Sequence, residues 1–185
     1  MEDAFALFGL ERRPLIDEAA LKETYLRIAA IRHPDLKGGD DEQFHLLQEA
    51  YKTLREPAAR LKHLMELEVP GAASQIDSAP HAELFMSAGS AVQAARAIFL
   101  RLESRTTALA RALLAPEAAS ALGKVRAALE SVQQAQDESR VRLESLDKRW
   151  PDVSRDELAD LASSFTFLER WISQLSEWEF RLSNG

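Results

Sequence analysis

The sequence predicts an all-α protein in two parts, in which four short helices precede an elongated bundle of three long helices. Alanine and leucine supply 57 of the 185 residues, against 17 for valine, isoleucine and threonine together, and this bias favours helices over sheets. Apolar residues also recur at spacings of three and four, the period of a helix with one buried face. Residues 69–80 (VPGAASQIDSAP) interrupt this periodicity with proline, glycine and serine. We therefore expect domains at residues 1–68 and 81–185, joined by a linker at 69–80.

The first two short helices have recognisable ends. Asp3 is placed to cap a helix that Gly9 ends, and Asp17 is placed to cap the next one. The second helix is expected to end near Arg32, because Pro34 lacks an N–H group and disfavours helical geometry in the residue before it.

A third helix is expected after the loop that contains Gly38 and Gly39, and Asp40 can cap it. Pro57 then opens a fourth helix, in which Arg60 and Lys62 are expected to face solvent. The apolar stripes of these two helices are Phe44, Leu47, Tyr51 and Leu54, and Leu61, Leu64 and Met65.

The second part contains three long helical segments, which the sequence separates at Pro116 and at residues 151–154. Ser154 and Glu157 form a capping box at the start of the third segment. The matched apolar seams of the three segments predict one bundle in which neighbouring helices are antiparallel. The seams run from Phe85 to Leu113, from Leu122 to Trp150 and from Leu158 to Leu175.

Composition excludes several classes of function. A net charge of −7 makes nucleic acid an unexpected partner, and the chain lacks cysteine for a thiol nucleophile or a cysteine-ligated metal. We expect no membrane span, no cofactor and a cytoplasmic location. No catalytic motif is present, and His45, His63 and His81 lack metal-ligand spacing and are expected at the surface.

One tripeptide, His33-Pro34-Asp35, stands between two helical stripes. The helices around this tripeptide resemble the J-domain in order and spacing. They are the short helix DAFALFGL, the helix with Tyr25 and Arg27, and the following helix with EAYKTL. The resemblance implies a co-chaperone whose loop docks on an ATP-bound heat-shock chaperone of the DnaK or HscA class and triggers hydrolysis there.

In this interpretation Pro34 fixes the loop backbone, Asp35 offers an ionised acceptor to an arginine of the partner, and His33 orients the loop. The second helix adds a basic face, although Leu26 stands where J-domains often place a lysine or arginine. The candidate chaperone-binding residues are His33, Pro34, Asp35, Tyr25, Arg27, Lys22, Arg32 and Lys37.

Features of the whole chain narrow the kind of J-protein. There is no Gly/Phe-rich linker and no cysteine-rich module, whereas FALFGL, EPAARLKHLMEL and a C-terminal helical bundle resemble HscB, the co-chaperone of iron-sulfur cluster assembly. The resemblance implies that the bundle binds the cluster scaffold protein through an apolar patch, in which Gly89 replaces a leucine of the family. The candidate client-binding residues are Leu84, Phe85, Met86, Phe167 and Trp171.

Two questions stay open at the level of sequence. Phe167, Trp171 and Trp178 lie beside the seam of the last helix, so their rings either pack on the other helices or bind a partner. The chain could also bring the chaperone to a client other than the cluster scaffold, and a structural adaptor with a degenerate J-domain is a third alternative.

Overall fold

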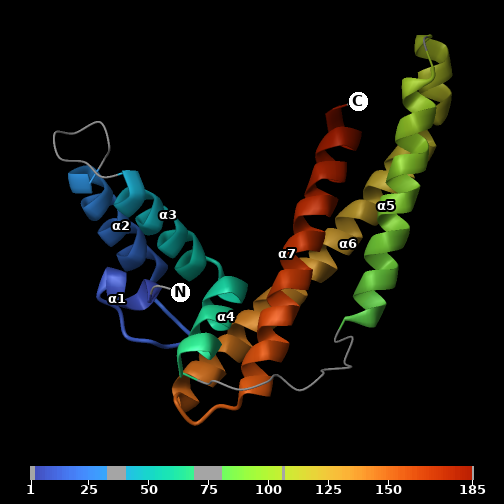
Figure 1. Cartoon of the computed structure of the whole chain (residues 1–185). Helices are drawn as coiled ribbons and strands as arrows, with labels where there is room; N and C mark the ends of the chain where they lie inside the picture. The colour runs from blue at the N-terminus through green and yellow to red at the C-terminus, as the bar shows by residue number, and fades with distance from the viewer. Residues whose placement is uncertain (1–2, 33–40, 69–80, 106, 185) are drawn as a thin grey trace. The chain divides into compact units, whose positions relative to one another are not determined.

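The computed structural model describes residues 3–32, 41–68, 81–105 and 107–184, and seven helices form its secondary structure over these ranges (Figure 1). By their contacts the residues form two compact units, Met1–Ile76 with Arg140–Ser163, and Asp77–Ser139 with Ser164–Gly185. The helices are α1 (Ala4–Phe8), α2 (Glu18–Arg32), α3 (Asp41–Arg55), α4 (Pro57–Glu68), α5 (Ala82–Glu103), α6 (Ala108–Arg149) and α7 (Arg155–Asn184).

The ends of α1 and the start of α2 follow the predicted capping residues. The Asp3 carboxylate accepts hydrogen bonds from the backbone N–H groups of Phe5 (3.0 Å) and Ala6 (3.2 Å), and Gly9 ends α1 in the left-handed conformation with φ 64°. The Asp17 carboxylate likewise accepts from the first turn of α2. The predicted Asp40 cap of α3 lies outside the described residues.

An antiparallel pair, α2 and α3, forms the centre of the first unit, and α1 and α4 pack against α3 (Figure 1). The predicted stripe of α3 is buried at Leu47 and Leu54, and that of α4 is buried at all three positions. The core that joins α1 to α4 consists of Ala4, Phe5, Phe8, Leu21, Leu47, Leu54 and Leu64.

Arg60 on α4 corrects the sequence prediction, because its side chain is buried rather than solvent-facing, with 1% exposure. Its guanidinium donates to the carbonyl oxygens of Pro14 (2.8 Å) and Leu54 (2.6 Å). Burial lowers the pKa of Arg60 to about 10. Arg60 thus satisfies two backbone acceptors inside the unit and ties the α1–α2 connection to the end of α3.

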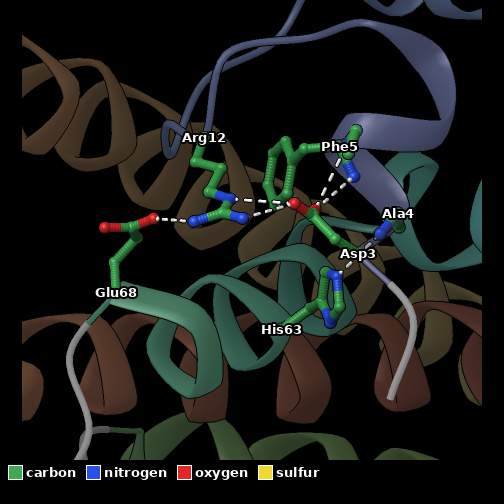
Figure 2. Close-up of polar contacts among 7 residues, drawn as sticks. Asp3, Ala4, Phe5, Arg12, His63 and Glu68 are labelled. Carbon is green, nitrogen blue, oxygen red and sulfur yellow. Dashed lines mark hydrogen bonds and ion pairs between the residues drawn. The ribbon is translucent and has the colours of Figure 1, made fainter.

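His63 is also buried, at 2% exposure, so the prediction of a surface histidine is wrong for this residue. Figure 2 shows its imidazole beneath the start of α1, where Nε2 accepts the N–H of Ala4 at 3.1 Å. The ring also stacks on Phe5 at 5.9 Å. Nearby, Arg12 bridges Asp3 and Glu68 (Figure 2), so α1 is fastened to α4 by both neutral and charged hydrogen bonds.

The long helices divide at a different place from the one predicted. The first, α5, ends at Glu103, and α6 begins at Ala108, where the Thr107 hydroxyl accepts the N–H of Ala110 at 3.2 Å. Pro116 therefore lies inside α6, on an exposed face where solvent can reach the carbonyl that the proline leaves without a donor. Because of the earlier break, Leu109 and Leu113 leave the predicted seam and are 73% exposed.

Helices α5, α6 and α7 share one core in the second unit, as expected for a three-helix bundle. It is built from small residues on α5, such as Ala88 and Ala95, that face larger ones on α6 and α7. The seam of α7 is buried as predicted at Leu158, Leu161, Phe165, Leu168 and Leu175.

The capping box at the start of α7 is formed as predicted. The Glu157 N–H donates to the Ser154 hydroxyl (3.2 Å), and the Glu157 carboxylate accepts the Ser154 N–H (3.1 Å). A hydrogen bond from Arg149, followed by the Ser154 N–H, lowers the pKa of Glu157 to about 2. The cap therefore keeps a negative charge at the positive end of α7 throughout the neutral range.

The ends of α6 and α7 that meet at residues 140–163 belong to the same compact unit as α1 to α4, although they lie within the predicted C-terminal domain. The Asp147 carboxylate on α6 accepts two hydrogen bonds from the Arg13 guanidinium (3.0 and 2.5 Å) and one from the N–H of Leu15 (3.0 Å). Trp150 packs against the α1–α4 core. A short segment of α6 and α7 is thus part of the packing that supports the first four helices.

Candidate functional site: a helix face and an aromatic surface

Three of the predicted chaperone-binding side chains lie exposed on α2. These are Lys22, Arg27 and Arg32, of which Arg32 is the last residue of the helix. His33, Pro34, Asp35 and Lys37 lie outside the described residues, so the predicted loop begins where the described part of α2 ends.

Tyr25 has a packing role in addition to any role at the surface. Its ring is half-buried and stacks on Tyr51 of α3, with centroids 4.2 Å apart and planes 20° apart. The guanidinium of Arg55 lies 5.9 Å from the Tyr51 centroid. This stack fixes α2 on α3 and so sets the direction in which the exposed side chains of α2 project.

The exposed face of α2 is weakly charged for a helix expected to meet another protein by electrostatics. Its three cations alternate with Glu18 and Glu23, both exposed, and Leu26 is 56% exposed in the middle of the face. Mixed charge and an exposed leucine provide short-range contacts rather than long-range steering.

The predicted client-binding residues are brought together on α5 and α7. We call Leu84, Phe85, Met86, Phe167 and Trp171 the client surface. Phe85 and Met86 are exposed (54% and 70%), whereas Leu84, Phe167 and Trp171 are half-buried against the bundle core.

Ring contacts organise the client surface across the two helices. Trp171 on α7 meets Phe85 on α5 edge to face, with centroids 5.8 Å apart, and it contacts Phe167 at 6.2 Å. These separations are typical of favourable aromatic pairs. The packing interpretation of the flanking aromatic residues is therefore supported, because Phe167, Trp171 and Trp178 pack against the bundle core. All three rings are half-buried, and their binding to a partner stays a prediction.

Sequence reasoning missed one member of this cluster. His81, the residue before α5, is half-buried and stacks on Phe167 with centroids 5.4 Å apart. Nothing in the local sequence indicates this contact, because Phe167 lies 86 positions away along the chain. His81 contacts the ring of Phe167 only because the folded chain places α7 beside the start of α5.

The described residues offer little for metal or membrane chemistry. Within 3–32, 41–68, 81–105 and 107–184, no group of three or more His, Asp or Glu side chains is placed to hold a metal ion. Among the helices so described, none is long and apolar enough to cross a bilayer.

No protein-family model matches the chain. It is 42% identical over 74 residues to a co-chaperone HscB homologue of Cupriavidus taiwanensis, covering 36% of this chain and 42% of that protein. It is 35% identical over 94 residues to a second HscB homologue, from Aromatoleum aromaticum, covering 46% and 50%. The chain thus spans half or less of these curated relatives.

The comparison of structures covers far more of the chain. Chaperone HscB from Vibrio cholerae superposes with a TM-score of 0.61 at 17% identity, over 98% of this chain and 99% of that one. The chain has the HscB fold. The predicted all-α architecture and the resemblance to HscB-type J-domain co-chaperones are therefore confirmed.

In this HscB-like chain the two candidate surfaces belong to different compact units. The face of α2 lies on the unit that contains α1 to α4, and the client surface lies on the unit that contains α5. Each surface has its own packed support, the Tyr25–Tyr51 stack in one unit and the Trp171 cluster in the other. The described residues thus carry two separate candidate surfaces, one in each compact unit.

Proposed function

We propose that this protein is a J-type co-chaperone that stimulates ATP hydrolysis by a heat-shock chaperone of the DnaK or HscA class. The observation that carries the proposal is the combination of sequence similarity to HscB homologues with the HscB fold over nearly the whole chain. The chain itself is not an enzyme, since the chemistry takes place in the ATPase partner. We place the interaction between the co-chaperone and its ATPase partner in the cytoplasm.

The chaperone-binding site consists of the exposed face of α2 and the loop that follows it. Pro34 restricts the backbone, and the Asp35 carboxylate pairs with an arginine of the partner, while His33 orients the loop. Lys22, Tyr25, Arg27, Arg32 and Lys37 complete the site. The exposure of Lys22, Arg27 and Arg32 on one helix supports this assignment.

The client is the iron-sulfur cluster scaffold protein, which binds the client surface of α5 and α7. Exposed Phe85 and Met86 beside a half-buried Trp171 supply an anchor of the kind that carries most of the energy in protein interfaces. The unbranched thioether of Met86 can adapt its shape to a partner.

A second candidate function keeps the chaperone partner and changes the client. It is favoured by one observation, Gly89 on α5, which stands where we align a leucine of the HscB family and removes one apolar side chain from the surface. In that case an unidentified protein occupies the same aromatic cluster.

The first test is the ATPase rate of the cognate heat-shock chaperone with the full chain and with His33→Gln. We expect the wild-type chain to accelerate hydrolysis and the variant to lose this effect, at an unchanged melting temperature. His45→Gln is the matched control, because His45 is an exposed histidine on α3 outside the proposed site. Equal stimulation by wild type and His33→Gln would refute the assignment of the tripeptide.

A further inference from the structure

The first compact unit contains a cavity between α1, α3 and α4 that neither candidate surface uses. Its volume is about 230 Å³. An apolar cavity of about 150 Å³ is enough to hold benzene, so this one has room for a single ring with a short chain attached. Figure 2 draws part of the wall, at Asp3, Ala4 and His63. The residues that line the cavity are Asp3, Ala4, Leu7, Leu46, Glu49, Ala50, Thr53 and His63.

Two segments by which the sequence resembles the J-domain supply most of the wall. Ala4 and Leu7 belong to DAFALFGL, whereas Glu49, Ala50 and Thr53 belong to EAYKTL. The alanine and leucine side chains make the wall largely apolar. Glu49 and Thr53 are one helical turn apart on α3, so a carboxylate and a hydroxyl group reach the cavity from the same side. Because Glu49 is exposed, the cavity is open to solvent at this side.

The side chains that line the cavity give it a negative charge. Among the described residues Glu49 has no hydrogen-bonding or ion-pair partner, whereas the Asp3 carboxylate already accepts hydrogen bonds from Arg12 and from the first turn of α1. His63 adds no positive charge, because Nε2 accepts the N–H of Ala4 and so carries no proton. The described lining includes neither lysine nor arginine. A positively charged occupant would therefore give the Glu49 carboxylate the partner that it lacks.

We infer that this cavity is a binding site for a small apolar amine, in which an ammonium group is attached to a body of about the size of a benzene ring. The body packs against Ala4, Leu7 and Ala50, and the ammonium group donates to the Glu49 carboxylate and the Thr53 hydroxyl. A neutral ligand of the same shape keeps the apolar contacts and loses the charge-assisted hydrogen bond. An anionic ligand is excluded, because its charge would meet the carboxylate of Glu49. This site lies outside the proposed chaperone-binding and client-binding sites and does not depend on them.

Two-dimensional NMR of the full chain during titration with benzylamine tests this inference. We expect saturable shifts at the backbone amides of Ala4, Leu7 and Ala50, with a dissociation constant on the order of 1 mM for a ligand of so few atoms. Benzyl alcohol, which has the same shape without the charge, should bind about threefold to tenfold more weakly, and phenylacetate should cause no saturable shift. Lack of saturation at about twenty times the expected dissociation constant, or equal binding of benzyl alcohol, would refute the inference.

Variants of α3 locate the bound amine. Glu49→Gln should reduce the affinity for benzylamine to that for benzyl alcohol. Glu66→Gln is the matched control, because it removes an exposed carboxylate of α4 outside the cavity, and its affinity should stay within about twofold of wild type. Ala50→Leu should abolish saturable binding by filling the cavity, and its melting temperature shows whether the fold is intact; if the fold is damaged, Glu49→Gln alone decides. Benzylamine binding that is unchanged in Glu49→Gln would overturn the assignment of the site.

Discussion

Asp147 provides the sharpest test of how α6 supports the first four helices. The Asp147 residue is only 8% exposed, and its carboxylate accepts two hydrogen bonds from Arg13 and one from the N–H of Leu15. Replacement by alanine removes the charged acceptor and leaves the Leu15 N–H without its partner. We expect the unit that contains α1 to α4 to be destabilised by this change.

The magnitude follows from the kinds of contact that are lost. A hydrogen bond to a charged group is worth about 1.5–3 kcal/mol, and an unsatisfied backbone donor costs about 1–3 kcal/mol when it is buried. The Arg13 side chain is 43% exposed, so water recovers part of its loss. We therefore expect Asp147→Ala to lower the free energy of unfolding by about 2–4 kcal/mol. Arg13→Ala, which leaves the Leu15 contact in place, should cost less.

Amide hydrogen exchange of α3 measures this change inside the unit concerned. A loss of 2–4 kcal/mol corresponds to an increase of about 30-fold to 1,000-fold in the exchange rates of its most protected amides. A double-mutant cycle with Arg13→Ala then isolates the pair energy. Unchanged protection in Asp147→Ala would refute the reasoning that the α6 segment stabilises this unit.

The pH dependence of the same variant gives an independent check. Partial burial acts to raise the pKa of Asp147, but the hydrogen bonds from Arg13 and Leu15 outweigh it, so the pKa lies below its ordinary value of 3.8. A depressed folded-state pKa stabilises the protein above the unfolded-state pKa, and this stabilisation is lost as the pH falls through the folded-state value. The difference between wild type and Asp147→Asn should therefore shrink below about pH 4.

Three further predictions concern other sites. Arg60→Met should lower the free energy of unfolding by about 2–4 kcal/mol in urea titrations followed by hydrogen exchange, because two buried carbonyl groups lose their donor; a neutral result would show that water replaces the guanidinium. Phe167→Ala should weaken scaffold binding by about 1 kcal/mol or more in calorimetry at unchanged helicity, and a loss of helicity would instead identify Phe167 as core. In wild type, α7 should lose stability as the pH falls from 4.5 toward 2, because the charged Glu157 cap, whose pKa is lowered to about 2, becomes protonated there. Glu157→Gln has no such charge and should not show this loss; identical acid melting curves for the two proteins would contradict this.

The sequence predicted those parts of the fold that depend on neighbours along the chain. The caps at Asp3 and Asp17 and the capping box of Ser154 and Glu157 formed as expected, because each joins groups only two or three residues apart. The α7 seam was also correct, since helical periodicity alone places its apolar residues on one face. The predicted boundary at Pro116 is wrong, because Thr107 caps α6 nine residues earlier and the helix continues through the proline.

The candidate sites were predicted only as lists of residues, and their geometry needed the fold. Similarity to a family selected Phe85 and Phe167, and the position of Trp171 beside the apolar seam added this residue. The edge-to-face contact of Phe85 with Trp171, however, depends on how α7 packs beside α5. The same packing adds His81 to the cluster. No spacing rule along one helix could indicate these neighbours, because the partners lie on different helices.

By itself, the sequence determined the helices, their caps and their apolar faces, since these result from interactions between residues within about one helical turn. The tertiary structure alone decided which polar groups are buried and what satisfies them. The local pattern predicts Arg60 and His63 at the surface. Arg60 can be buried because it donates to the carbonyl of Pro14, 46 positions away. His63 can be buried because it accepts the N–H of Ala4, 59 positions away. A buried polar group is stable only where it has a hydrogen-bonding partner, and in these two cases the fold supplies that partner from a distant part of the sequence.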